Sequence, residues 1–359
     1  MRLAGDVSYM KILLLNPSFW IYGGAERVIV RFCQYCSEHH IQITILTTQM
    51  INEVRNDLID TRLIFCKDLP EMSNILRLIH QDFDVIFYNN HPCELMSYGI
   101  KNKNIWLCNE PQSFLDLGYV PDKEKEVVNN FIDKVIVADE FNQKRFKELY
   151  NMDSEIANYG IDYDFFSQEI SPIDKYEIKE NFVITQVGFI HPTKNTKFTY
   201  EIFKEVLKKI PDAKLILVGQ EIEPYSGELR NQIIKDGNMG NVIFTGVVNR
   251  EEVRNIYNLT DVVLMPVKSQ GSWLSPFEAI SVGVQVLVSK EFTAQMILKK
   301  VANITPVTEI KDYVALIYDF ILLEKLGKDE TLSMKEDKKW IKENLTWNKF
   351  SEKVLEIMK

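Results

Sequence analysis

The sequence predicts an α/β protein made of two doubly wound domains, each built around a parallel sheet. Short aliphatic runs alternate with longer amphipathic patterns, which is typical of parallel strands connected by helices. With 359 residues the chain is longer than one hydrophobic core usually supports. The alternation stops in a polar stretch near residues 167–181 and then resumes. We therefore expect two domains joined near residues 165–182.

Ten apolar runs define the strands that we expect. Five precede the polar stretch, at residues 11–16, 43–48, 84–88, 104–108 and 134–138, and five follow it, at residues 182–188, 213–219, 241–246, 261–266 and 284–289. Residues 324–359 show mixed charges and helical spacing of apolar residues, so they are expected to form terminal helices. The resulting domains are residues 10–170 and 171–340, with a terminal helix at 341–359 that is free to pack back on the first domain. Residues 1–9 are interpreted as an appendage.

Charge and hydropathy exclude several classes of protein. The chain has 42 basic and 51 acidic residues, a net charge of −9, which argues against nucleic acid as a partner but permits a local basic pocket. Its apolar runs are shorter than the ~20 residues that span a bilayer. We expect a cytoplasmic protein, and peripheral contact with the inner membrane face stays open.

The five cysteines all lie in the first third of the sequence, and an odd, scattered set does not suit a disulfide framework. Cys33 and Cys36 have CxxC spacing and precede His39 and His40, so a metal or redox site has to be weighed. On a helix the same spacing places two small apolar side chains on one face. No second ligand pair follows at zinc-site spacing, so we expect neither a metal nor a cofactor.

The first candidate site follows the first strand, where Gly23 and Gly24 open the next helix. Without Cβ atoms they allow a ligand to approach the unpaired N–H groups of the helix start, which suits an anion. A tight turn between strand and helix explains the two glycines equally well. The dinucleotide-binding pattern GxGxxG is absent, which disfavours a nicotinamide-dependent enzyme.

Lys194 provides the second candidate, because it stands between a strand and a helix expected from about Thr196. Its ammonium and the helix dipole could act together on one diphosphate. The simpler alternative is a solvated loop lysine. His191 could add a donor nearby, or be merely exposed.

The third candidate is Glu278, in the segment SPFEAIS. Ser275 suits an N-cap, Pro276 the first helical position and Glu278 the third, a capping box worth about 1 kcal/mol. Alternatively, the carboxylate accepts hydrogen bonds from the two neighbouring hydroxyls of a ribose. The backbone of residues 271–274 would then face the sugar and phosphates.

Five segments together resemble the retaining GT-B glycosyltransferases, in particular glycosyltransferase family four. The segments, which occur in the family's order, are GGAERV at 23–28, WLCNEP at 106–111, NYGIDYDFF at 158–166, VGFIHPTKN at 187–195 and QGSWLSPFE at 270–278. The resemblance covers nearly the whole chain. It implies two Rossmann-like domains that face a cleft, with acceptor binding by the first domain and nucleotide-sugar binding by the second.

The resemblance also assigns roles to individual residues. It implies that Lys194 holds the leaving diphosphate and that Glu278 takes the ribose hydroxyls, so these two are the expected catalytic residues. The expected donor-binding set adds Gly23, Gly24, Gln270, Gly271, Ser272, Trp273 and Leu274, and Asn109 is expected on the acceptor or sugar side.

Three positions depart from the family pattern. Phe189 replaces the usual arginine, Gln270 replaces the first of two glutamates, and Asn109 replaces a frequent histidine. The loss of a bidentate guanidinium and of a carboxylate weakens the expected grip on the donor. Asparagine can donate to a sugar hydroxyl but cannot shuttle a proton near neutral pH.

The function expected from this resemblance is metal-independent, retaining transfer of a hexose from GDP-mannose or a UDP-hexose to a glycan or lipid-linked acceptor. The resemblance of the first two segments tilts the expected donor towards mannose. The three departures motivate a different class, a non-catalytic GT-B protein that serves as a binding or partner subunit. An epimerase or phosphorylase on the same fold is a further alternative.

Overall fold

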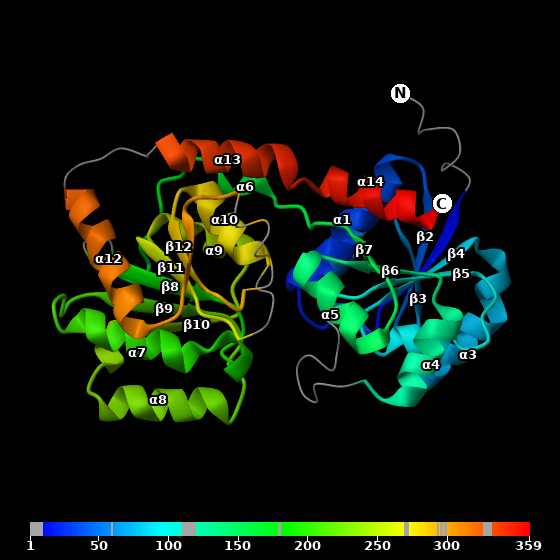
Figure 1. Cartoon of the computed structure of the whole chain (residues 1–359), viewed down its shortest axis with the longest axis horizontal. Coiled ribbons are helices and arrows are strands. Elements are labelled where there is room, and N and C mark those ends of the chain that lie inside the picture. Colours follow the sequence, from blue (N-terminus) through cyan, green and yellow to red (C-terminus); the bar gives the residue numbers. More distant parts are fainter. Residues whose placement is uncertain are drawn as a thin grey trace. The chain divides into compact units, whose positions relative to one another are not determined.

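The computed structural model divides the chain into two compact units (Figure 1). It describes residues 10–58, 60–109, 120–178, 181–268, 273–292, 294, 297, 300–325 and 332–359. Unit 1 runs to Gly160 and resumes at Leu345, and unit 2 comprises Ile161–Asn344.

Unit 1 contains a seven-stranded parallel sheet in the order β3-β2-β1-β4-β5-β6-β7. Its strands are β1 (Lys11–Leu15), β2 (Gln42–Thr47), β3 (Arg62–Phe65), β4 (Val85–Asn89), β5 (Lys103–Leu107), β6 (Lys134–Val137) and β7 (Glu155–Ile156). The central strand β1 pairs in parallel with β2 on one side and β4 on the other. Its residues 12–15 are completely buried, as expected for a strand covered on both faces.

Helices cover both faces of this sheet (Figure 1). They are α1 (Gly24–Glu38), α2 (Asn52–Asp57), α3 (Leu69–Ile79), α4 (Asp122–Phe131), α5 (Glu140–Tyr150) and α14 (Trp347–Met358), with the short 3-10 turns η1 (His80–Asp82) and η2 (Cys93–Ser97). The C-terminal helix α14 packs against α1, so the end of the chain belongs to unit 1. On the opposite face from α1, Trp106 of β5 packs edge-on against Phe146 of α5, with ring centroids 5.7 Å apart.

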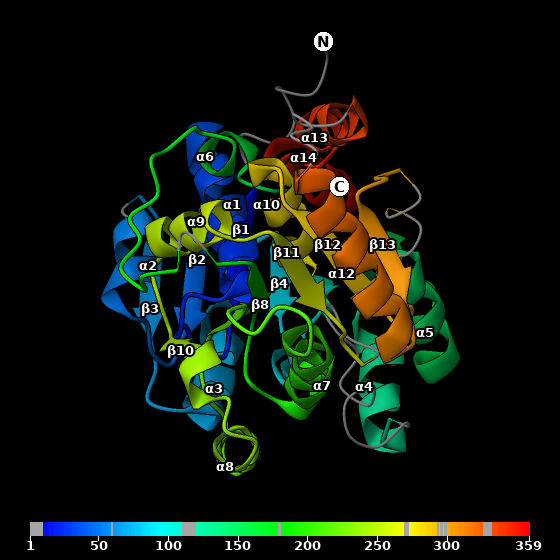
Figure 2. The same ribbon diagram turned by 90° about the vertical axis from the view of Figure 1, so that its left-hand side faces the viewer.

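Unit 2 contains a six-stranded parallel sheet in the order β10-β9-β8-β11-β12-β13. Its strands are β8 (Val183–Val187), β9 (Lys214–Val218), β10 (Val242–Gly246), β11 (Val262–Met265), β12 (Gln285–Ser289) and β13 (Ile304–Val307). Its helices are α6 (Tyr163–Phe166), α7 (Thr196–Leu207), α8 (Tyr225–Lys235), α9 (Arg250–Asn258), α10 (Leu274–Val282), α12 (Ile310–Lys325) and α13 (Leu332–Asn344), with the 3-10 turns η4 (Pro192–Lys194) and η5 (Met239–Asn241). Helix α12 contacts α7, and α10 contacts α6, α9 and α13 (Figure 2).

The predicted fold class of two doubly wound parallel sheets is confirmed, and each of the ten predicted strands is present. Three strands were not predicted: β3, β7 and β13. All three lie at the edges of their sheets. Strand β3 is partly exposed and therefore lacks the long apolar run that marks a buried strand. Strand β7 has only two residues, which is too short to give a sequence signal.

The chain leaves unit 1 at Gly160, earlier than the predicted boundary at residue 170, and it returns after Asn344 instead of residue 340. Residues just after Gly160 are held by helix α9 of unit 2. Asp162 pairs with the Arg250 guanidinium at 2.5 Å, and this guanidinium lies 4.4 Å from the centroid of the Phe165 ring. These contacts tie α6 to unit 2, although the polar composition that suggested a linker begins only at residue 167.

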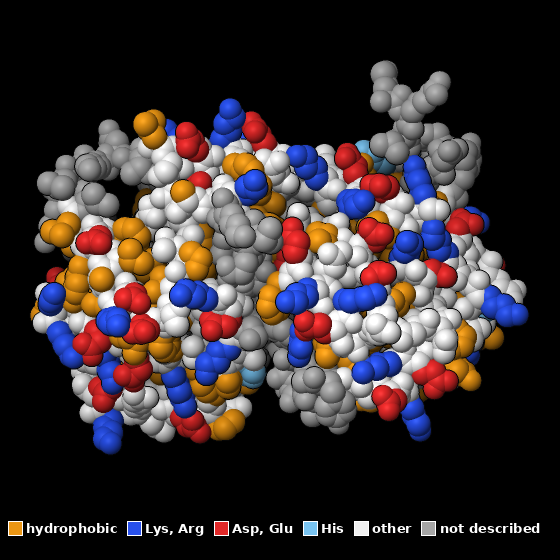
Figure 3. Space-filling model, viewed as in Figure 1, with side chains coloured by type: hydrophobic (Ala, Val, Ile, Leu, Met, Phe, Trp, Pro, Cys, Tyr) orange, Lys and Arg blue, Asp and Glu red, His pale blue; other side chains and the backbone are white. Residues whose placement is uncertain are grey.

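Charged side chains of both signs are interspersed on the face of the molecule shown in Figure 3. This agrees with the modest net charge and gives no single-sign surface on that face. Within the described part of the chain, no helix has the length and apolar character needed to cross a bilayer.

Gly160 is a position where the backbone leaves no room for a side chain. A Cβ atom there would lie 2.3 Å from the backbone nitrogen of Trp347, at the start of α14. Gly160→Ala is therefore expected to destabilise the protein by about 1–3 kcal/mol, because the two backbone segments would have to separate. Chemical denaturation monitored by Trp fluorescence measures the change.

Gly240→Ala is the matched control, since a Cβ at Gly240 meets nothing within 4 Å. Equal stability of the two variants would show that the close approach at Gly160 contributes nothing.

Candidate functional site

Each sheet contains one place where the strand order reverses, and parallel sheets bind ligands at the carboxyl ends of such strands. In unit 2 the reversal lies between β8 and β11, and in unit 1 it lies between β1 and β4. The connections that leave these neighbouring strands cross to opposite faces of the sheet, so a crevice is left between them. The residues predicted to carry function can be placed relative to these two positions.

In unit 2 the loop after β8 is joined to the loop after β11. The Lys268 N–H donates to the Thr193 carbonyl oxygen at 2.9 Å. His191 begins the first loop, and its Nδ1 accepts a hydrogen bond from the Thr193 N–H at 3.3 Å. The same Nδ1 lies 2.9 Å from the Thr193 Oγ1 atom, so Thr193 fixes the orientation of the ring.

Lys194 is the last residue of η4, and its side chain extends over Gly188 at the end of β8. The Lys194 Cγ, Cδ and Cε atoms lie 3.7 Å from the position that a Cβ of Gly188 would occupy. The backbone carbonyl of Lys194 accepts a hydrogen bond of 2.6 Å from Nε2 of the buried Gln186 in β8. The sheet therefore anchors the loop that carries the lysine.

The predicted capping box at Ser275 and Glu278 is wrong. Helix α10 begins at Leu274, Trp273 occupies the N-cap, and no side chain caps the helix. Glu278 consequently lies in the second turn, where its carboxylate cannot serve as the third-position partner of Ser275. The side chain is nevertheless buried, with 5% of its surface exposed.

Burial of Glu278 therefore needs an explanation other than capping. Carboxylates are rarely this buried unless hydrogen-bond donors compensate the loss of water. The neighbouring side chains Trp273 and Leu274 are also buried, and the Trp273 ring packs on Phe277 at 5.1 Å. Gln270, Gly271 and Ser272, also predicted to bind the donor, lie outside the described residues.

In unit 1 a chain of carboxamides follows the strands at the reversal. Asn89, at the end of β4, donates to Oδ1 of Asn16, directly after β1, at 2.7 Å. Asn109, after β5, uses its Nδ2 to donate to Oδ1 of Asn89 at 3.0 Å and to Oδ1 of Asn90 at 2.7 Å. The Tyr159 hydroxyl donates to Asn109 Oδ1. Both N–H bonds of Asn109 are thus directed at other side chains of unit 1.

The paired glycines lie at the start of α1, with Gly23 at the N-cap and Gly24 as the first helical residue. The protein's own Glu26 accepts the Gly23 N–H at 3.1 Å. Burial raises the pKa of the Glu26 carboxyl, and its backbone hydrogen bonds, including that from Gly23, act in the opposite direction. An exogenous anion at this helix start would share the N–H groups with Glu26.

Two ionisable residues of this region were not predicted: His91 and Glu94. His91 follows Asn90, and its Nδ1 lies 2.7 Å from Oε1 of Glu94, which is 99% buried. One sequence signal could have revealed the region: asparagines stand where two apolar strands end, Asn16 after β1 and Asn89 with Asn90 at the end of β4. The burial of Glu94 leaves no trace in the sequence.

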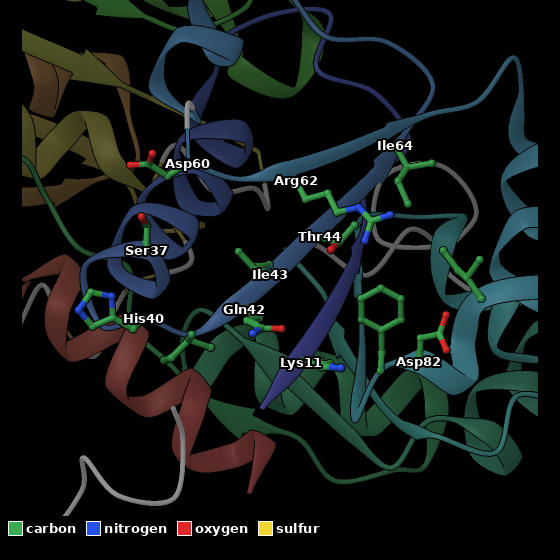
Figure 4. Close-up of a pocket in the computed structure, with 13 residues that line it drawn as sticks. Lys11, Ser37, His40, Gln42, Ile43, Thr44, Asp60, Arg62, Ile64 and Asp82 are labelled. Atoms are coloured by element: carbon green, nitrogen blue, oxygen red, sulfur yellow. The ribbon is translucent and has the colours of Figure 1, made fainter. Parts of the chain in front are cut away.

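A cavity of about 740 Å³ lies at the end of the unit 1 sheet where strands β1, β2 and β3 begin (Figure 4). Lys11, Gln42 and Arg62, the first residues of β1, β2 and β3, contribute to its lining. It is therefore at the amino ends of the strands, whereas the candidate residues follow their carboxyl ends. The cavity and the candidate site are therefore at opposite ends of the strands, and we do not assign the cavity to the candidate site.

Comparison with known proteins identifies the family. The profile of the family "Glycosyl transferases group 1" matches residues 168–347, about half of the chain and most of unit 2. The chain belongs to the group 1 glycosyl transferases.

Curated relatives match over part of their length. A UDP-Gal:alpha-D-GlcNAc-diphosphoundecaprenol alpha-1,3-galactosyltransferase of Escherichia coli is 31% identical over 157 residues, covering 40% of this chain and 38% of the relative. An uncharacterized glycosyltransferase of Methanocaldococcus jannaschii is 24% identical over 247 residues, covering 64% of this chain and 52% of the relative. The chain thus spans about two fifths to one half of these relatives.

Solved structures share the fold over nearly the full chain. HepE of Anabaena, in complex with UDP and glucose, has a TM-score of 0.83 at 16% identity and covers 98% of this chain and 99% of its own. Sucrose-phosphate synthase from Thermosynechococcus elongatus has a TM-score of 0.79 at 12% identity, with 97% and 98% covered. The predicted GT-B fold is confirmed.

The position at which α10 begins can be tested by comparing an alanine variant of Ser275 with an alanine variant of Asn249, both in unit 2. Ser275→Ala should cost much less than the ~1 kcal/mol of a lost N-cap, because Ser275 lies inside the helix. Asn249→Ala should cost about that amount, because Asn249 caps α9 through the Glu252 N–H at 2.9 Å. Thermal unfolding of both variants measures the difference in stability. An equal loss of stability in the two variants would indicate that Ser275 does cap the helix, as the capping-box prediction requires.

The CxxC pair can be tested by thiol modification. Cys33 and Cys36 are completely buried on α1, and burial raises the pKa of both thiols. Since the thiolate is the reactive form, neither should be alkylated by iodoacetamide in the native protein, and both should react after unfolding. Peptide mapping by mass spectrometry measures the labelling. Rapid native labelling that zinc prevents would support a metal site instead.

Proposed function

We propose that the protein transfers a hexose from a nucleotide-sugar donor to a hydroxyl of a glycan or lipid-linked acceptor, with retention of configuration. The observation that carries this proposal is that unit 2 has an anchored lysine in the loop after β8 and a buried, non-capping carboxylate in the helix after β11, the two strands between which the strand order reverses. Lys194 follows β8, and Glu278 lies in the helix after β11. Membership of the group 1 glycosyl transferases supports the same reading.

A site for the donor requires a cationic group that binds the diphosphate and a hydrogen-bond acceptor that binds the ribose hydroxyls. We assign the diphosphate to Lys194, assisted by backbone N–H groups near the start of α10, and the ribose hydroxyls to Glu278. A UDP-hexose is favoured over GDP-mannose, because the E. coli relative is named for UDP-Gal and the HepE structure contains UDP. GDP-mannose stays within the donor panel to be tested.

Retention demands that the acceptor hydroxyl approach the face from which the diphosphate departs. The bond between the anomeric carbon and the phosphate oxygen breaks, a bond to the acceptor oxygen forms, and the hydroxyl proton passes to the departing phosphate oxygen. The protein's contribution is then electrostatic: Lys194 and the helix N–H groups stabilise the charge that develops on the diphosphate. This division of labour needs no metal ion, so transfer should persist in EDTA.

A non-catalytic binding subunit is the second candidate. Phe189, which is 37% exposed, stands where the family pattern has arginine. The carboxamide of Asn109, where the pattern often has histidine, has both N–H bonds engaged within unit 1. Nucleotide binding without transfer to any acceptor would favour this candidate.

Lys194→Ala is expected to weaken UDP binding by about 10- to 100-fold and to abolish transfer, because the variant loses a charge-assisted contact to the diphosphate. Glu278→Gln should weaken binding of UDP and of uridine alike, since it acts on the ribose. Calorimetry with UDP and uridine, together with product analysis on a panel of nucleotide sugars, measures both effects.

Lys197→Ala is the matched control. Lys197 pairs with Glu228 at the surface, at 2.6 Å, so its loss should change neither binding nor transfer. Unchanged UDP affinity in Lys194→Ala would overturn the assignment of the diphosphate.

A further inference from the structure

The His91 and Glu94 pair forms a second polar centre in unit 1, beside the carboxamide chain. His91 directly follows Asn90, and Asn90 accepts a hydrogen bond from Asn109. Glu94 is the second residue of η2 and lies behind the histidine, with its Oε1 2.7 Å from the His91 Nδ1. The side chains are 24% and 1% exposed, respectively.

Burial of Glu94 is costly and serves no helix cap or core packing that would require a carboxylate. Its neighbours on η2 include the completely buried Cys93, which lies against Met72 in the core of unit 1. The Oε2 atom of Glu94 is buried without a hydrogen-bond partner among the described residues. Burial raises the pKa of the Glu94 carboxyl, and the hydrogen bond and charge of His91 act in the opposite direction. A buried carboxyl group of this kind is usually retained for what it does to its partner.

The partner is held in one orientation. Because Nδ1 faces Glu94, the opposite ring nitrogen, Nε2, points away from it. Nε2 has no hydrogen-bond partner within the described residues, and 24% of the His91 side chain is exposed. The pair thus presents one oriented imidazole nitrogen next to the strand reversal of unit 1.

The surroundings restrict the kind of group that this nitrogen can bind. Glu94 and Glu124 of α4 both act electrostatically on His91, and Cys93 and Tyr150 of α5 are the other titratable groups that Glu94 influences. The negative charge of Glu94, in contact with the ring, and the electrostatic influence of Glu124 disfavour a phosphate or a carboxylate as the ligand. A neutral hydroxyl can donate to Nε2 or accept from it, and so it fits either protonation state of the ring.

We infer that His91, oriented by Glu94, binds a neutral hydroxyl group of the acceptor sugar in the proposed transfer. This inference rests on the proposed function and specifies the acceptor: the part bound at His91 is a polyol, and any diphosphate of a lipid carrier is held elsewhere. His91 touches the substrate and Glu94 is a positioning residue. The neighbouring carboxamide side chains can also donate hydrogen bonds to sugar hydroxyls and accept hydrogen bonds from them.

The desolvation of the ring lowers the pKa of His91, whereas the hydrogen bond and charge of Glu94 raise it, and the net shift is upward. Loss of the Glu94 charge should therefore lower the pKa of His91. This shift reports the pairing of the two side chains, and the acceptor KM reports what the pair does for the substrate.

The experiment uses the full-length protein and the best acceptor from a panel of alkyl glycosides and alkyl-diphosphate-linked monosaccharides. His91→Ala is expected to raise the KM for this acceptor at least tenfold while UDP affinity changes less than twofold. His91→Gln, which keeps a donor and an acceptor, should restore part of the loss. Glu94→Gln should raise the acceptor KM and lower the pKa of His91 in histidine NMR spectra.

His80→Ala is the matched control, because His80 also pairs through Nδ1 with a side chain, Asn102, but before β4, at the amino end of the strand. It should leave the acceptor KM unchanged. Inorganic phosphate should not shift the ring resonances of His91, and a saturable shift would overturn the assignment to a neutral hydroxyl.

Failure of this inference is distinguishable from failure of the proposed function. If the wild-type protein transfers sugar and His91→Ala has the same acceptor KM, the inference is wrong and the transferase proposal stands. If the wild-type protein transfers to no acceptor in the panel, both are wrong.

Discussion

The reversal of strand order within each parallel sheet is the constraint on which the candidate sites depend. Connections between parallel strands are right-handed, so the chain covers one face of the sheet on one side of the reversal and the other face beyond it. At that point two neighbouring loops diverge, and polar backbone and side chains at the strand ends stay accessible. Lys194 after β8, Asn16 after β1 and Asn89 at the end of β4 all occupy such positions.

The two units place different chemistry at this shared position. Unit 2 has a lysine in the loop after β8 and a buried glutamate in the helix after β11, groups that suit a ligand with a diphosphate and a vicinal diol. Unit 1 brings neutral carboxamides that bond mainly to one another, together with a histidine held by a buried carboxylate. The proposed function assigns the charged donor to unit 2 and the hydroxyl-bearing acceptor to unit 1, so that one architecture repeated twice would hold two unlike substrates.

Much of the fold could be predicted because central parallel strands are buried on both faces and therefore appear as continuous apolar runs. The runs at β1 and β11 are examples. Edge strands such as β3 and β7 carry no such signal, and their existence depends on a neighbour that supplies hydrogen bonds. The start of α10 was misplaced because Ser275, Pro276 and Glu278 satisfy a local capping pattern, whereas the structure begins the helix one residue earlier than that N-cap, at Leu274.

The sequence by itself determined the two α/β domains, the positions of Lys194 and Glu278 after particular strands, and the buried helical face that contains Cys33 and Cys36. These follow from local periodicity and from the order of elements along the chain. Only the tertiary structure decided that Glu278 is no cap, that Asn109 is bonded to Asn89 and Asn90, and that Glu94 lies buried behind His91. Burial and side-chain pairing arise between segments distant in sequence, so no local pattern encodes them.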